Sequence, residues 1–304
     1  MRNALVGLAL AGLVLAAPAS AALRVLATTT DLAALAAAVG GELVSVESFV
    51  APGADAEAFE PRPRDLERLR RADLLLRVGL GYDHWLDALV NRHGDNRFMR
   101  GGAAHVDAST GVPLLELRGR SAVSEDGHAH GIANPHYWLD PQNAVIVTAG
   151  ITEALVRLVP EQRDRLIASR ERFLGELRAR QVRWAQALAP FAGARLIAYH
   201  NSWPYFARRF RLDIVDIIEP KPGVAASPAH LAKLIAQGRS SGVRAVLHEP
   251  YQPDDASRFV AQKLGVPVLR FALSVGSVPA AVDYFGLIEH DVALLAAALS
   301  GANR

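Results

Sequence analysis

Four polar residues lie at the ends of predicted strands or just before a predicted helix cap, and their side chains are of the kinds that bind transition metals. They are Glu57 after the second strand, His136 in "NPHYWLDP", His200 at the end of "RLIAYH" and Glu249 at the end of "RAVLHEP". Ligands of open α/β sheets lie beyond the carboxyl ends of the strands. Imidazole and carboxylate groups together suit a divalent first-row metal, and zinc accepts both. The sequence therefore predicts a metal site among these residues.

Each of these residues also has an ordinary structural explanation. A single histidine at a strand end is more often hydrogen-bonded within the fold than a ligand, and a glutamate in a proline-bounded loop is usually solvated. The prediction rests on the constellation, because two of the residues fall in each half of the chain. A further pair, His128 and His130 in "SEDGHAHG", forms either a mobile metal-collecting tract or a plain flexible loop.

The elements that would position these residues alternate between short apolar strands and helices. Residues 23–109 carry four predicted strands, and residues 194–273 carry four more. Such alternation predicts parallel sheets joined by right-handed crossover connections. The expected fold class is α/β, in two halves that each hold a mainly parallel sheet flanked by helices.

Between the halves, residues 161–190 have a different pattern. The apolar positions that recur there at helical intervals are Leu166, Phe173, Leu177 and Trp184. They predict a helix of roughly 28 residues, about 40 Å long at 1.5 Å per residue. Because these positions do not sustain three heptads, a rigid spine is favoured over a coiled coil. We expect an N-terminal lobe at 22–160, this interdomain helix, and a C-terminal lobe at 191–304.

The start of the sequence predicts export. Residues 1–21 have Arg2 before a short apolar run and end in Ala-Ser-Ala, which is typical of a cleaved secretory signal peptide. The alternative is a membrane anchor, but a span needs about 20 apolar residues and this run is shorter. No cysteine follows that could carry a lipid. We therefore expect a periplasmic protein that is not lipidated.

Composition excludes several classes of chemistry and partner. The chain has no cysteine, so disulfides, thiolate catalysis and cysteine-based zinc sites are ruled out. Its formal net charge is only +2, and no run of Lys or Arg interleaves with aromatic residues. Nothing therefore indicates nucleic acid as a partner. Any metal must be held by His, Asp or Glu.

Taken together, the motifs resemble the periplasmic metal-binding proteins of zinc and manganese ABC transporters. The similar stretches are "GADAEAFEPRPRDLERLRRADLLLRVGLGYDHWLDAL", "NPHYWLDPQNA", "YHNSWPYFARRFRL" and "HEPYQP", and the long helix is similar to the family's interdomain helix. The resemblance implies two lobes with a metal in the cleft between them, and it places His136 and His200 at ligand positions. It also implies capture of the ion and its delivery to a permease.

The sequence departs from that family in two places. Glu57 stands where the family usually has a histidine, and "VLRFALSVGS" after the last strand lacks the acid that the family often has there. A metal bound by Glu57, His136 and His200 then needs a fourth ligand. Glu249 is the nearest candidate and water is the alternative, while Ser274 would be a weak ligand. If the site has instead decayed, the protein binds something else.

The leading hypothesis is a solute-binding protein that holds Zn²⁺ without catalysis and passes it to an ABC permease in the inner membrane. The same ligands could hold Mn²⁺ or Fe²⁺. A chelate such as haem or a siderophore, bound against Tyr137, Trp138 and Trp203, is a third possibility. A zinc hydrolase is least favoured, because neither H-E-x-x-H nor G-x-S-x-G is present.

Two further expectations concern partners and pH. A periplasmic metallochaperone is a second candidate partner, and we expect the protein to be a monomer. Only a neutral imidazole ligates a metal, so metal affinity is expected to fall around pH 6.5 and below, as His136 and His200 become protonated.

Overall fold

The computed structural model of the chain describes residues 22–116 and 132–301. The expected signal peptide, residues 1–21, and the pair His128 and His130 lie outside the described residues. Among the helices of the described part, none has both the length and the apolar character needed to cross a bilayer.

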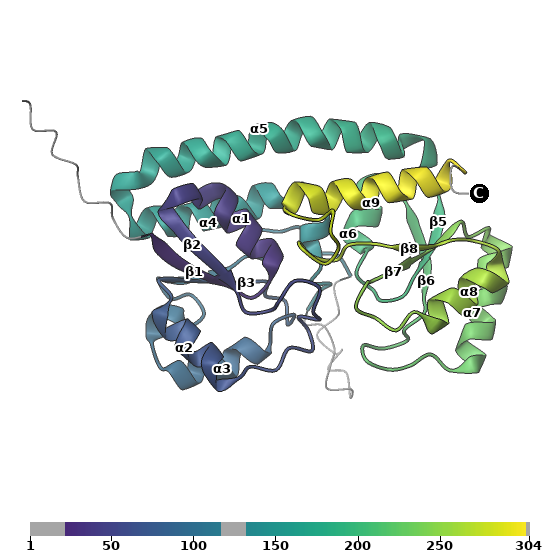
Figure 1. Cartoon of the computed structure of the whole chain (residues 1–304), viewed down its shortest axis with the longest axis horizontal. Coiled ribbons are helices and arrows are strands. Elements are labelled where there is room, and N and C mark those ends of the chain that lie inside the picture. Colours follow the sequence, from purple (N-terminus) through teal and green to yellow (C-terminus); the bar gives the residue numbers. More distant parts are fainter. Residues whose placement is uncertain (1–21, 117–131, 302–304) are drawn as a thin grey trace, which may run out of the picture.

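Each half of the chain forms one four-stranded parallel sheet (Figure 1). The first sheet has the order β2-β1-β3-β4 and the second has the equivalent order β6-β5-β7-β8. The strands are β1 (Leu23–Ala27), β2 (Val44–Ser48), β3 (Leu74–Arg77), β4 (His105–Asp107), β5 (Arg195–Ala198), β6 (Asp213–Ile217), β7 (Ala245–His248) and β8 (Val268–Arg270). In each sheet the strand order reverses next to the central strand, which is where ligands of doubly wound sheets bind.

Helices cover both sheets, as parallel strands require. The α-helices of the described residues are α1 (Thr30–Gly40), α2 (Pro63–Arg71), α3 (Trp85–His93), α4 (Asn143–Leu158), α5 (Arg163–Leu188), α6 (Pro204–Phe210), α7 (Pro228–Ser241), α8 (Asp255–Leu264) and α9 (Tyr284–Leu299). The central strands β3 and β7 are buried at every position, because helices pack on both of their faces. The expected α/β class, with a mainly parallel sheet in each half, is confirmed.

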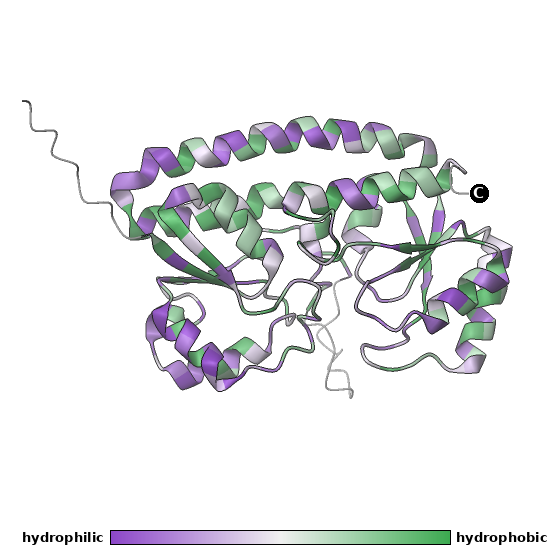
Figure 2. Ribbon diagram, viewed as in Figure 1, coloured by the Kyte–Doolittle hydropathy of each residue, from purple (hydrophilic) through white to green (hydrophobic). Residues whose placement is uncertain are grey.

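The long helix predicted between the halves is α5, which runs along both lobes (Figure 1). Its 26 residues present one buried stripe, made of Leu166, Phe173, Leu174, Leu177, Trp184 and Leu188. The rest of the helix surface is mostly hydrophilic (Figure 2). Short 3₁₀ turns that contain Pro160 and Pro190 flank the helix, because proline removes a backbone donor and disfavours continuation of the α-helix.

The last helix, α9, ties the two halves together. It packs beside α5 and also contacts α1 of the first lobe, although it follows the second sheet in sequence. Trp184 of α5 donates an indole hydrogen bond to Glu289 of α9, at 2.7 Å. The two helices therefore lie side by side; α5 runs along both lobes, whereas α9 extends from the junction of the lobes over the second lobe (Figure 1).

A short stretch after β8, residues 272–277, connects the lobes from below this layer; we call it the junction segment. The backbone N–H of Val275 donates to Asp31 Oδ1 at 2.9 Å, and the carbonyl of Leu273 accepts from the Trp138 indole at 3.0 Å. Gly276 has φ +81°, and a Cβ there would lie 2.7 Å from Pro52 Cβ, so a larger residue would force the lobes to shift. The junction segment is therefore fixed to the first lobe.

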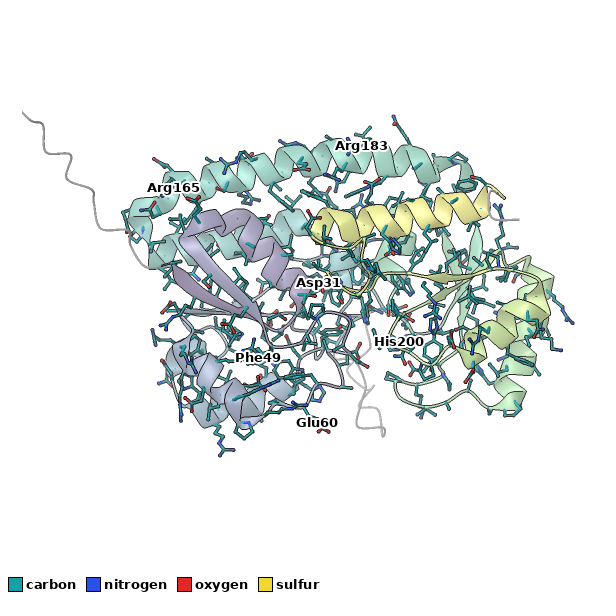
Figure 3. The ribbon with its side chains drawn as sticks, viewed as in Figure 1. Asp31, Phe49, Glu60, Arg165, Arg183 and His200 are labelled. Atoms are coloured by element: carbon teal, nitrogen blue, oxygen red, sulfur yellow. The ribbon has the colours of Figure 1, made fainter. Side chains whose placement is uncertain are left out.

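Asp31 is buried at the centre of this contact. It lies in the first turn of α1, is 1% exposed, and appears between the two lobes in Figure 3. Burial raises the pKa of its carboxyl from 3.8 to about 7, although hydrogen bonds from Val275 and from its own backbone oppose the rise. The contact between the lobes therefore includes a carboxyl that titrates near neutral pH.

Replacing Asp31 by asparagine should stabilise the protein above pH 7. The folded state holds the Asp31 proton up to about pH 7, whereas the unfolded chain releases it near 3.8, so the wild type loses stability as pH rises between these values. Asparagine keeps the acceptor for Val275 without the charge. We expect a gain of up to about 4 kcal/mol at pH 8, at ~1.4 kcal/mol per pH unit, which disappears near pH 4.

The measurement is urea unfolding of Asp31→Asn and wild type from pH 4 to 8. Asp164→Asn is the matched control, because Asp164 occupies the first turn of α5 but is exposed. A constant difference between Asp31→Asn and wild type across this range would show that the buried carboxyl is not the titrating group.

Candidate metal centre

Three of the four candidate residues come together between the lobes. Glu57, His136 and His200 each offer one ligand atom, and these atoms all lie within 4.8 Å of one another. Glu57 Oε1 is 3.2 Å from Nε2 of His136 and 3.6 Å from Nε2 of His200. Glu57 and His136 belong to the first half of the chain and His200 to the second, so the group exists only when both lobes meet.

Glu57 is positioned by a turn that follows β2. Asp55 Oδ1 accepts hydrogen bonds from the backbone N–H of Glu57, at 2.9 Å, and of Ala58, at 3.3 Å. The Trp85 indole donates to the carbonyl of Ala56 at 3.0 Å, which holds the same turn against α3. This is a typical use of Asp in a turn, where the side chain binds backbone groups two and three residues ahead. The turn leaves the Glu57 side chain 22% exposed.

His136 is fully buried and oriented by Asn134. Asn134 Oδ1 accepts the backbone N–H of His136 at 3.0 Å and lies 3.2 Å from its Nδ1. Because this oxygen can only accept, Nδ1 carries the proton and the lone pair of Nε2 points toward Glu57. The rings of Tyr82 and Trp138 pack on the imidazole, with ring centres 5.4 and 5.3 Å away. The expected partly apolar setting is present.

His200 follows β5 and is oriented by Glu219, a residue that the sequence reasoning missed. Glu219 Oε2 is hydrogen-bonded to Nδ1 of His200, and its Oε1 accepts the N–H of Gly223 at 2.7 Å. Nδ1 therefore donates, and Nε2 points toward the cluster. Glu219 stands two residues after the end of β6, so the same strand-end argument could have identified it.

The two imidazoles have opposite pKa shifts. Burial lowers the pKa of His136, and the nearby Glu57 only partly opposes this. Burial also acts to lower the pKa of His200, but the hydrogen bonds with Glu219 and Glu57 outweigh it and hold the pKa well above 6.5. At neutral pH without metal, His136 is neutral and His200 carries a proton. The shared value near 6.5 assumed from sequence does not describe either residue.

Glu249 lies beside this cluster but is not one of its members. It is fully buried, and its Oε1 accepts from the Ser202 hydroxyl at 2.9 Å and from the Trp203 indole at 2.8 Å. Burial raises the pKa of its carboxyl, with the charge of His200 opposing the rise. Its neighbour His248 is bonded to Ser257 Oγ and the carbonyl of Gln252, within its own lobe.

The site brings Nε2 of two histidines close to one carboxylate oxygen of Glu57, and both imidazoles can bind a metal ion when they are neutral. Such a mixed set suits Zn²⁺ and also Mn²⁺ or Fe²⁺. A cavity of about 610 Å³ leads to it, and both Glu57 and His200 line this cavity. In Figure 3, His200 lies on the side of the second lobe that faces the first. The arrangement can hold an ion that enters between the lobes.

The chain is similar to known metal-uptake and metal-binding proteins along most of its length. The model of the family described as "Zinc-uptake complex component A periplasmic" matches residues 25–298. The chain is 25% identical over 233 residues to "High-affinity zinc uptake system protein ZnuA" of Yersinia pestis, covering 71% of this chain and 72% of that protein. It is 24% identical over 247 residues to "Iron-binding protein YfeA" of the same organism, covering 80% and 74%.

A solved structure shows the same fold. The structure of the SBP FpvC from Pseudomonas aeruginosa in complex with Mn²⁺ aligns with a TM-score of 0.78 and 22% identity, over 92% of this chain and 99% of that one. At this identity the likeness concerns the fold alone.

Replacing Glu219 by glutamine should weaken metal binding without unfolding the protein. Glutamine can still accept from His200 Nδ1, but it lacks the charge that raises the basicity of the ring. Loss of such an orienting partner typically costs about 10- to 100-fold in metal affinity. Zinc titration calorimetry measures the change, with Asp213→Asn on the exposed part of β6 as control. Equal affinities for both variants would show that Glu219 does not act through His200.

Metal binding at pH 7 should release about one proton per ion, because only neutral imidazoles ligate. The proton comes from His200, whose pKa is raised by Glu219 and Glu57, whereas His136 is already neutral. Affinity should therefore increase with pH through neutrality rather than level off above 6.5. Calorimetry in buffers of different ionisation enthalpy counts the protons. A binding heat that is the same in all buffers at pH 7 contradicts this assignment.

Proposed function

Because the chain belongs to the zinc-uptake complex component A periplasmic family, we propose that Glu57, His136 and His200 bind its transported metal ion. The protein is a metal-binding substrate-binding protein of that family, whose relatives bind zinc, iron or manganese. One observation carries the proposal: Nε2 atoms from two lobes face the same carboxylate oxygen of Glu57. An ion at this point would replace the His200 proton between them.

For the ion itself we propose Zn²⁺, with Mn²⁺ and Fe²⁺ as the alternatives. Two nitrogen donors favour zinc, while a carboxylate in place of a third imidazole moves the preference toward manganese or iron. Among first-row dications zinc binds most sites more tightly than manganese, so availability also decides which ion is carried. The intact cluster supports a functional site over a decayed one.

For Glu249 we propose the role of a buried charge beside the ion. The sequence led us to expect a ligand there; in the structure Ser202 and Trp203 hold its Oε1, and Glu249 is not a member of the three-residue cluster. The charge of Glu249 adds to those that raise the pKa of His200. It therefore favours positive charge at the cluster, whether a proton or a dication.

The partner that receives the ion is, in this proposal, an ABC permease of the inner membrane. Relatives are named as substrate-binding components of metal ABC transporters. Several of those relatives are named lipoproteins, whereas we propose a periplasmic protein without a lipid, loaded directly or by a metallochaperone and acting as a monomer. We propose no catalytic activity.

Replacing Glu57 by alanine should abolish near-stoichiometric metal binding. It removes the only carboxylate of the three-residue cluster within the described residues, and with it the negative charge that the dication meets. We expect affinity to fall by at least about 100-fold, more than for Glu249→Gln, because loss of a ligand exceeds loss of a supporting group. Metal content after dialysis and competitive titration with Zn²⁺ and Mn²⁺ provide the measurement.

Glu60→Ala is the matched control for Glu57→Ala, because Glu60 lies in the same loop, is exposed and is not a member of the cluster. Metal content should be unchanged in this variant. If Glu57→Ala binds zinc as tightly as Glu60→Ala does, Glu57 is not a ligand.

A further inference from the structure

The cavity beside the cluster is formed by loops of both lobes. Its wall includes parts of the loops after β2, β3, β6 and β7, and its volume is about 610 Å³. Of the three cluster residues, Glu57 and His200 line the cavity, while His136 is fully buried. An ion held by the cluster would therefore face this cavity on one side.

The described residues leave part of the coordination of such an ion unassigned. Zinc takes four ligands and manganese usually six, whereas the cluster offers three donor atoms. Glu249 is not a member of the cluster; Ser202 and Trp203 hold its Oε1, and its buried Oε2 has no hydrogen-bond partner among the described residues. The junction segment has no acid, and its N–H groups bind Asp31 and Asp291. At least one position is then left to a ligand from elsewhere, and the cavity has room for it.

The size and walls of the cavity suit a small organic molecule. A water molecule occupies about 30 Å³ of the liquid, and pockets for small molecules have volumes of about 300–1,000 Å³. The rings of Phe59, Tyr82 and Tyr251 line the cavity. Burial raises the pKa of both phenols well above 10, so they remain neutral hydrogen-bond donors and acceptors. Such walls can contact an apolar or aromatic group as well as a polar one.

The charged side chains that line the cavity favour some small molecules over others. The acidic side chains Asp55, Glu57, Glu60 and Glu219 line the cavity, and the basic groups there are two imidazoles, His84 and His200. Anions such as citrate or phosphate would meet repulsion from these carboxylates. A zwitterion could place its ammonium or imidazole group near them and its donor atoms on the ion.

From these observations we infer that the chain binds its ion as a ternary complex. The third component is a small zwitterionic chelator of amino-acid type, whose nitrogen and oxygen donors complete the coordination from the cavity. This inference rests on the proposed function, because it requires an ion at Glu57, His136 and His200. It refines the substrate from a bare dication to a dication with one neutral chelator.

The probe for this inference is radiolabelled L-histidine, which offers amine, imidazole and carboxylate donors. The full chain is loaded with Zn²⁺, freed of excess ion and equilibrated with the label by dialysis, and retained zinc is measured with retained label. Zinc-loaded protein should retain histidine in an amount equimolar with the ion, whereas metal-free protein retains none. Radiolabelled citrate in a parallel experiment should not be retained.

A variant that fills the cavity distinguishes this site from other binding. Ala58 lines the cavity and is exposed, so Ala58→Trp should leave zinc binding intact but weaken histidine retention at least about ten-fold, equivalent to ~1.4 kcal/mol. Ala54→Trp is the control, because Ala54 is an exposed alanine of the same loop that does not line this cavity.

The possible outcomes separate the inference from the function on which it rests. Failure to bind zinc, manganese or iron would overturn the proposed function. Stoichiometric zinc without histidine would overturn only the ternary complex, and so would histidine that metal-free protein or Ala58→Trp retains equally well. Retention of citrate to the same extent would overturn the choice of a zwitterion.

Discussion

One carboxylate oxygen, Oε1 of Glu57, contacts a histidine from each half of the chain. Glu57 Oε1 lies within 3.6 Å of imidazole nitrogens from both halves of the chain. Without metal, this arrangement is stabilised by the proton on His200, which lies between two carboxylates. A dication in the same place would supply the positive charge that the His200 proton otherwise provides. Positive charge at the cluster therefore offsets these carboxylates, and a proton and a metal ion compete to supply it.

The supporting residues make this competition possible because they fix the direction of each ligand atom. Asn134 and Glu219 each bind the Nδ1 side of a histidine, so both Nε2 atoms point into the cleft. The two supports differ in charge, and this accounts for the opposite pKa shifts of His136 and His200. One histidine is ready to bind metal at neutral pH, and the other must first lose a proton.

A rigid frame holds the lobes at the distance that this geometry needs. Helix α5 runs along both lobes, α9 packs on α5 and also contacts α1, and the junction segment is bonded to Asp31 and Trp138 of the first lobe. The missing acid after β8 is consistent with this role. The backbone there makes contacts between the lobes, and acidic side chains from α1 and α9 accept its N–H groups. A segment that could have provided a ligand serves instead as a structural link.

Much of the fold follows from local sequence patterns. The alternation of strands and helices, the buried stripe of the long helix and the positions of Glu57 and His200 after strands are all readable along the chain, because they depend on periodicity and on turn residues. The partners of Asp140 were less predictable, because its carboxylate accepts the N–H of Gln142 and pairs with Arg209 of α6, which is distant in the sequence.

The sequence by itself determined the element order, the long helix and four candidate residues able to bind a metal. Only the tertiary structure decided which of the candidates meet, that Ser202 and Trp203 hold Oε1 of Glu249, and that the Glu219 carboxylate stabilises the protonated form of His200. These features depend on distances between side chains that are far apart in the chain. Hydrogen-bond partners and burial set pKa values and ligand directions, and both arise only when the two lobes pack together.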